Sequence, residues 1–133
     1  MKTRHSFIPF VLFSMWLCGG ATLRAQDPII QTKYTADPAP MVYNDTVFLY
    51  TGHDEDDAYS FKMFDWQLYT STDMVNWTDC GAPLKTSHFK WSAGDASAAQ
   101  CIERDGKFYW HISSQNRFSP GSSIGVAVAD TPY

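Results

Sequence analysis

The same three-strand pattern occurs twice in this chain. The segment Val42–Tyr50 aligns with Ile102–Trp110 at an offset of 60 residues, and Leu68–Asp73 aligns with Gly125–Asp130 at an offset of 57. Each copy predicts a hairpin, a long polar loop and a third strand that ends in an aspartate turn. Self-similarity at this period is typical of β-propellers, in which each repeat forms one sheet, called a blade.

The strands are short runs of β-forming residues bounded by turn residues. Asn44-Asp45-Thr46 joins the first pair, and Arg104-Asp105-Gly106 joins the second, where Asp-Gly is a strong hairpin signal because it accepts positive φ. No stretch after residue 25 has useful helical periodicity, so we predict an all-β fold. The predicted strands are Met41–Tyr43, Val47–Thr51, Gln67–Ser71, Gln100–Glu103, Lys107–Ser113 and Ile124–Ala129.

Two repeats do not make a closed propeller. Each blade buries its faces against its neighbours, repeat arrays need about three or more units for stability, and propellers close with about four to eight blades. The chain stops at Tyr133, directly after the second aspartate turn. We therefore expect residues 26–133 to be about the first two blades of a longer protein, called the full-length protein below.

Residues 1–25 predict a secretory signal peptide. A basic start precedes an apolar run of 12 residues, Phe7–Cys18, and small residues lead to a cleavage site after Ala25. The run is too short to span a bilayer. We expect export to the periplasm or the cell exterior. A lipid anchor on Cys18 is the second choice, because Met15-Trp16-Leu17 lacks the small residue expected before a lipidated cysteine.

The charge balance after residue 25 excludes some partners. Residues 1–25 hold three of the ten basic side chains and none of the acidic ones, so seven basic side chains remain against fourteen acidic ones, a net charge of −7. An acidic surface argues against nucleic acid or anionic lipid as a partner.

The cysteines and histidines do not form a metal-binding pattern. Cys80 and Cys101 can pair in an exported protein or stay free thiols, and the sequence leaves both open. His53, His88 and His111 are scattered and lack zinc spacing. We expect no metal site and no required cofactor within this chain.

The motif Thr35-Ala36-Asp37-Pro38-Ala39-Pro40 leads into the first hairpin. Pro38 disfavours the helical region for Asp37, which predicts an extended conformation there, and Pro40 keeps the approach stiff. A carboxylate aimed by backbone constraint suits a catalytic acid or base. The start of an ordinary strand can look the same, so the motif by itself leaves both interpretations open.

An ordered set of motifs in this chain resembles glycoside hydrolase family 43. The set comprises Thr35–Pro40, Val42–Asp56, Tyr69–Trp77, Ala99–Trp110 and Gly125–Tyr133, and it covers essentially all of residues 27–133. The members it resembles most act on arabinose- and xylose-containing plant polysaccharides. The resemblance implies a five-bladed propeller that hydrolyses with inversion through three central carboxylates, and a cell-wall polysaccharide or oligosaccharide as the partner.

By this resemblance Asp37 is the general base. The general acid, a Glu, and an Asp that tunes the pKa of the acid belong to later blades, and neither Asp95 nor Glu103 matches their motifs. In an inverting glycosidase the base activates water while the acid protonates the leaving oxygen, with the two carboxyl groups roughly 6.5–9.5 Å apart and different in pKa. We therefore expect the full-length protein to be the enzyme and the 133-residue chain alone to be inactive.

Several residues are candidates for binding the sugar. The resemblance places His53 and Asp54 near the pocket rim, Trp66 and Trp91 (with Phe64) are candidates for stacking, and Gln100 can bond a sugar hydroxyl. Core burial of the tryptophans and backbone pairing of Gln100 are the alternatives. The acidic run 53–57 lacks the alternating ligands of a calcium loop. A structural Ca²⁺ is compatible with the full-length propeller.

Two other functions remain open at this point. The runner-up is a non-catalytic carbohydrate-binding propeller, or an inactive fragment, that keeps the pocket without the acid. A protein-interaction propeller is the third, and it predicts that Asp37 is dispensable, because propellers host many functions.

Overall fold

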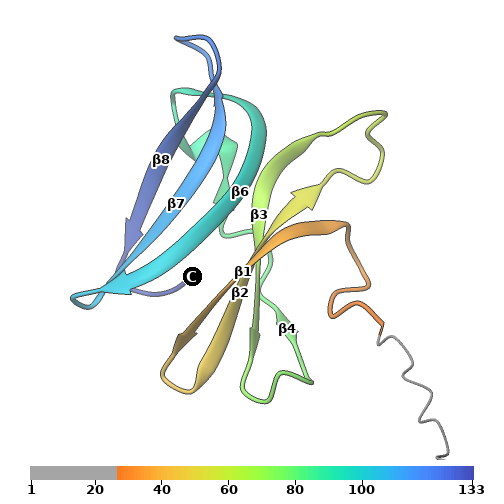
Figure 1. Cartoon of the computed structure of the whole chain (residues 1–133), viewed down its shortest axis with the longest axis vertical. Helices are drawn as coiled ribbons and strands as arrows, with labels where there is room; N and C mark the ends of the chain where they lie inside the picture. Colours follow the sequence, from red (N-terminus) through yellow and green to blue (C-terminus); the bar gives the residue numbers. More distant parts are fainter. Residues whose placement is uncertain (1–26) are drawn as a thin grey trace, which may run out of the picture.

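The computed structural model describes residues 27–133, so the predicted signal peptide and Cys18 lie outside the described residues. Residues 27–133 form two antiparallel β-sheets (Figure 1). The first has the order β1 (Thr35–Tyr43), β2 (Thr46–Asp54), β3 (Met63–Ser71) and β4 (Thr78–Asp79), with β5 (Leu84–Lys85) also paired to β3. The short 3₁₀ helix η1 (Thr86–His88) leads to the second sheet, which has the order β6 (Ser92–Arg104), β7 (Lys107–Asn116) and β8 (Ser122–Ala129).

The predicted all-β fold and each predicted strand are confirmed, but β1, β3 and β6 each begin four or more residues earlier than expected. β1 starts at Thr35 and runs through Pro38 and Pro40, and β6 starts at Ser92. β1 is an edge strand, where proline is tolerated because one side of the strand needs no ladder hydrogen bonds. Within residues 27–133, no helix has the length and apolar character needed to cross a bilayer.

The two hairpin turns fix the true relation between the repeats. Tyr43 pairs with Thr46 and Arg104 with Lys107, so each turn has two central residues. The first central residue is Asn44 in one hairpin and Asp105 in the other. Both residues have positive φ, as tight hairpin turns require. Matching the turns gives a structural offset of 61 residues for the hairpins, and the β2–β3 and β7–β8 pairing gives 58 for the third strands. The predicted offsets of 60 and 57 were wrong by one residue.

Shifting the match between the two repeats by one residue assigns each matched side chain to the opposite face of its strand. Tyr50 and Trp66 of the first sheet face the second sheet and are fully buried. The second sheet meets them with Trp110, whose ring centroid lies 4.6 Å from that of Tyr50. With the corrected offsets Trp66 corresponds to Ile124, which lies on the opposite face of the second sheet and is 77% exposed. The apolar face that is buried in the first sheet is therefore repeated, uncovered, on the second.

The turn after β3 is organised by one carboxylate. Asp73 accepts hydrogen bonds from the backbone N–H groups of Asn76 and Val75 at 2.8 and 2.9 Å, and from the Asn76 side chain and the Ser71 hydroxyl at 2.8 and 3.0 Å. These bonds, led by the one from the Asn76 backbone, hold the pKa of Asp73 well below its usual range. The sequence predicted an aspartate turn at the end of this third strand, and this network is its physical basis.

An Asp73→Ala variant is expected to melt at a lower temperature at pH 7. Because the folded pKa lies below the unfolded value of about 3.9, the stabilisation is complete above that pH and is lost as the pH falls toward the folded pKa. The difference in Tm should therefore shrink between pH 7 and pH 3 in circular dichroism melts. Asp57→Ala, on an exposed loop, is the control. If the Tm difference between Asp73→Ala and the wild type were equal at pH 7 and pH 3, the stabilising role assigned to the ionised Asp73 carboxylate would be contradicted.

Candidate functional site

Asp37 lies in a β-bulge on the edge strand β1. The pairing of β1 with β2 shifts between Ala36 and Ala39, so Asp37 and Pro38 together face a single residue of β2. Bulges re-aim side chains and are common beside active sites. The Asp37 side chain is exposed.

The backbone of Asp37 is left-handed, with φ of 51°, so the predicted extended conformation was wrong. Pro38 disfavours the right-handed helical region for the preceding residue, but aspartate also visits the left-handed region as a single residue. Such conformations carry a strain of about 1–3 kcal/mol and persist where the surrounding structure imposes them. Here the β1–β2 ladder continues on both sides of the bulge.

The segment before Asp37 is anchored across the first sheet. The Tyr34 carbonyl accepts the Asp54 backbone N–H at 3.0 Å. Lys33 Nζ donates to Gln67 Oε1 at 2.9 Å and to Asp79 Oδ2 at 3.0 Å. The hydrogen bond from Lys33 is the main reason that the pKa of Asp79 lies below its usual range. These contacts hold the chain that enters the bulge.

His53 sits at the same end of the sheet, on the strand beside Asp37. Its Nδ1 lies 3.0 Å from Asp65 Oδ1, an oxygen that also accepts a hydrogen bond from Gln67 Nε2 at 2.8 Å. Because a carboxylate accepts, His53 donates from Nδ1 and keeps Nε2 as its second hydrogen-bonding atom. Sequence reasoning missed Asp65. The sequence signal that could have identified Asp65 was the alternation of side chains along β3, the strand that pairs with the strand of His53.

Glu55 approaches the same pair. Donor atoms of His53, Glu55 and Asp65 lie within 4.8 Å of one another, a spacing that can hold a divalent cation. His53 and Asp65 already satisfy each other by a hydrogen bond, which accounts for this geometry without an ion. The expectation that the chain needs no metal stays a prediction.

Asp54 lies at the end of β2, next to His53. It is half-buried, and its Oδ1 has no hydrogen-bond partner among residues 27–133. The structure thus places an unused acceptor at the end of the sheet that carries Asp37. A role for His53 or Asp54 at a pocket rim stays a prediction.

Trp66 does not stack on a sugar in this structure, and that candidate was wrong. The side chain is fully buried between the two sheets, and its Nε1 donates to the Ser97 carbonyl at 2.8 Å. Core packing covers both faces of the ring. Trp110 belongs to the same core.

Gln100 lies on β6 of the second sheet, and Trp91 directly precedes that strand. Trp91 is half-buried against Phe89, with ring centroids 5.7 Å apart. Gln100 is exposed on the outer face of the sheet, and its Nε2 donates to the Cys101 carbonyl at 3.1 Å. The structure does not gather these side chains with Asp37 into one cluster. Their sugar contacts stay predictions.

An ion pair joins the two sheets at the end that carries Asp37. Lys62 Nζ, in the β2–β3 loop, donates to both carboxylate oxygens of Asp95 on β6, at 3.0 and 3.2 Å. In Figure 1 the β2–β3 and β7–β8 loops lie toward the top and the two hairpin turns toward the bottom. The strand pairing places Asp37 beside the end of β2 that leads into the β2–β3 loop. This end is called the loop end below.

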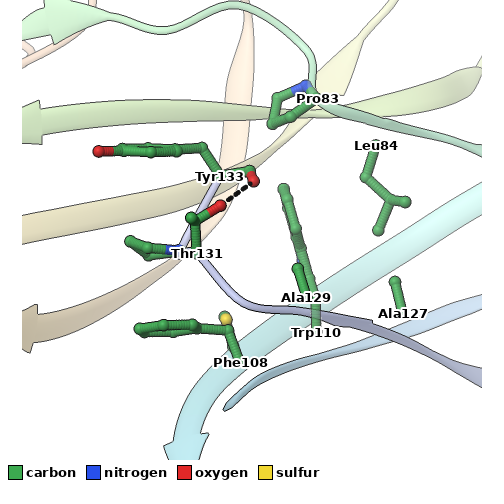
Figure 2. A pocket seen from close by; sticks show the side chains of 10 residues that line it. Pro83, Leu84, Phe108, Trp110, Ala127, Ala129, Thr131 and Tyr133 are labelled. Atoms are coloured by element: carbon green, nitrogen blue, oxygen red, sulfur yellow. Dashed lines mark hydrogen bonds between the residues drawn. The ribbon is translucent and has the colours of Figure 1, made fainter. Parts of the chain in front are cut away.

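A small cavity of about 130 Å³, whose lining does not include Asp37, lies between the sheets (Figure 2). Its described lining contains no carboxylate, and it includes the rings of Phe108 and Trp110 and the buried Cys101 thiol, whose pKa is raised by burial. Within residues 27–133, Cys80 and Cys101 form no disulfide. An apolar cavity without an acid or base is part of the packing between sheets and is not a reaction site.

Comparisons with known proteins point to one family. The profile described as "Glycosyl hydrolases family 43" matches residues 25–133. A xylosidase/arabinosidase of Bacteroides ovatus is 30% identical over 79% of this chain and 35% of its own length. An arabinoxylan arabinofuranohydrolase of Paenibacillus polymyxa is 32% identical over 80% of this chain and 19% of its own.

Solved structures agree with the sequence comparisons. A family 43 enzyme from Xanthomonas citri, complexed with xylotriose, is 28% identical and superposes with a TM-score of 0.73 over 80% of this chain and 32% of its own. The chain thus spans about a third, or less, of these relatives. The predicted fold is confirmed as about the first two blades of a five-bladed propeller.

Proposed function

This chain belongs to glycoside hydrolase family 43, and from that membership we propose that the full-length protein hydrolyses glycosidic bonds in arabinose- or xylose-containing plant polysaccharides. The names of the relatives, xylosidase/arabinosidase and arabinoxylan arabinofuranohydrolase, support this substrate class. The exported location predicted from residues 1–25 suits a polymer that cannot enter the cell.

The observation that carries the proposal is the placement of Asp37. It is an exposed carboxylate on an edge strand, in a bulge with left-handed backbone at the loop end. The hydrogen bonds of Lys33 and Tyr34 anchor the segment that precedes it. A general base must be accessible to water and held by its surroundings; the exposure of Asp37 and the β1–β2 ladder on both sides of its backbone support this role.

In the proposed reaction Asp37 accepts a proton from the water that attacks the anomeric carbon. The carboxylic acid on the other side of the sugar, supplied by a later blade, protonates the leaving oxygen, and the configuration inverts. The positive charge that develops on the sugar ring is stabilised by nearby carboxylates. His53, oriented by Asp65, offers Nε2 as a hydrogen-bonding atom at the same end of the first sheet.

The chain of residues 26–133 alone is expected to show no turnover of arabinoxylan, because Asp37 can perform only half of the acid–base chemistry. The full-length protein should release arabinose or xylose under the same conditions. Both proteins are assayed for reducing sugar after confirmation of β-structure by circular dichroism. Turnover by the purified short chain would contradict the proposal. A full-length protein that binds arabinoxylan without hydrolysing it would favour the non-catalytic alternative.

A further inference from the structure

Three of the six exposed aromatic side chains of the described residues lie in or next to the β2–β3 loop, at the loop end. Tyr59 is fully exposed, and Phe61 and Phe64 are 60% and 44% exposed, all in or next to the β2–β3 loop. The large apolar side chains exposed near the opposite end of the first sheet include the aliphatic Val42 and Val75.

Residues 55–64, here called the aromatic loop, are tied down at both ends. The Glu55 N–H donates to the Lys62 carbonyl at 2.9 Å, and the Lys62 side chain is paired with Asp95 of the second sheet. The Phe64 ring lies over Gly94, where an added Cβ would come within 3.2 Å of it. The rings are therefore displayed on an anchored loop, so little ordering entropy is lost when a ligand binds.

The loop continues directly from the strand that flanks Asp37. β2 pairs with β1 beside the bulge, and the loop begins at the residue after Asp54. A ligand that lies across the loop can therefore reach the reaction site without a break. The loop also carries the exposed carboxylates of Asp56 and Asp57, which repel anionic polymers and accept hydrogen bonds from hydroxyl groups.

We propose that the aromatic loop is a docking platform for the neutral main chain of a plant polysaccharide, with Tyr59 and Phe61 as the principal contacts. Flat apolar rings with a polar edge suit the faces of successive sugar units, and the neighbouring carboxylates suit their hydroxyl groups. The platform contacts sugars beyond the bond that is cleaved. It rests on the proposed function and specifies polymers, rather than short glycosides, as preferred substrates.

The test compares a polymer with a short substrate. In the full-length protein, Tyr59→Ala combined with Phe61→Ala should raise KM for arabinoxylan about tenfold, while kcat/KM for a small aryl glycoside stays unchanged. Met74→Ala combined with Val75→Ala, two exposed side chains distant from the loop end, is the matched control and should change neither value. Tyr59→Trp combined with Phe61→Trp should restore polymer affinity.

The outcomes separate this proposal from the proposed function. An unchanged KM for the polymer, or an equal loss on both substrates, would overturn the platform while leaving the hydrolase intact. If the wild-type protein hydrolyses neither substrate, the proposed function fails. The platform is then tested by the retention of the protein on insoluble arabinoxylan. Retention that is lost only in the aromatic-loop variant supports the platform, and unchanged retention overturns it.

Discussion

Asp37→Asn in the full-length protein is expected to lower kcat by about 10²–10⁴-fold, the usual contribution of a general base, with little change in stability. Asparagine keeps the size of the side chain and also tolerates the left-handed conformation that Asp37 adopts. It cannot accept a proton from water. Because the side chain is exposed, its replacement removes no core contact.

The measurement is the initial rate on arabinoxylan, together with Tm. Asp105→Asn is a matched control, because Asp105 is also an exposed aspartate with positive φ and lies in the hairpin turn at the opposite end. That control should keep full activity. An Asp37→Asn enzyme that retains most of its activity would remove Asp37 from the mechanism.

Trp66→Ala is expected to destabilise the protein by about 3–5 kcal/mol, as for other large buried aromatic side chains. The indole fills the space between the two sheets, and its hydrogen bond to the Ser97 carbonyl links them directly. Removing it leaves a cavity and an unpaired carbonyl. Against a total stability of about 5–15 kcal/mol, this loss is large enough to prevent folding.

Urea denaturation gives the measured value. Trp77→Ala is the control, because this ring is only half-buried in the turn after β3, and we expect a smaller loss. If Trp66→Ala does not fold, Trp66→Phe keeps most of the ring and removes the bond to Ser97, for an expected loss of about 1–3 kcal/mol. A Trp66 variant as stable as the Trp77 variant would contradict the packing described for the core.

The fold was predictable because its signals are local. Asp105-Gly106 and Asn44-Asp45 specify tight turns by their φ preferences, and alternating strands flank them. The register between the repeats was not predictable from side-chain similarity. Aligning Phe48 with Phe108 matches like residues, but the hydrogen-bonded turns show that these two side chains sit on opposite faces of their blades. Hydrophobic residues occupy both faces of an inner blade, so side-chain similarity alone could not choose between the two possible registers.

The site was predictable only in part. The resemblance singled out Asp37, yet its bulge depends on pairing with β2, which a local proline rule cannot supply. Trp66 was misassigned because a tryptophan between strands suits a sugar platform and a core equally well in sequence. The exposed rings of Tyr59 and Phe61 were overlooked because exposure follows from the tertiary fold.

The stereochemistry of hydrolysis tests the central claim most directly. Proton NMR of the full-length protein acting on arabinoxylan or a xylo-oligosaccharide, recorded within the first minutes, identifies the anomer released before mutarotation. If Asp37 activates water, the first product has inverted configuration. A first product of retained configuration would make a carboxylate the nucleophile and contradict the assigned role of Asp37. Complete absence of product would contradict the hydrolase itself.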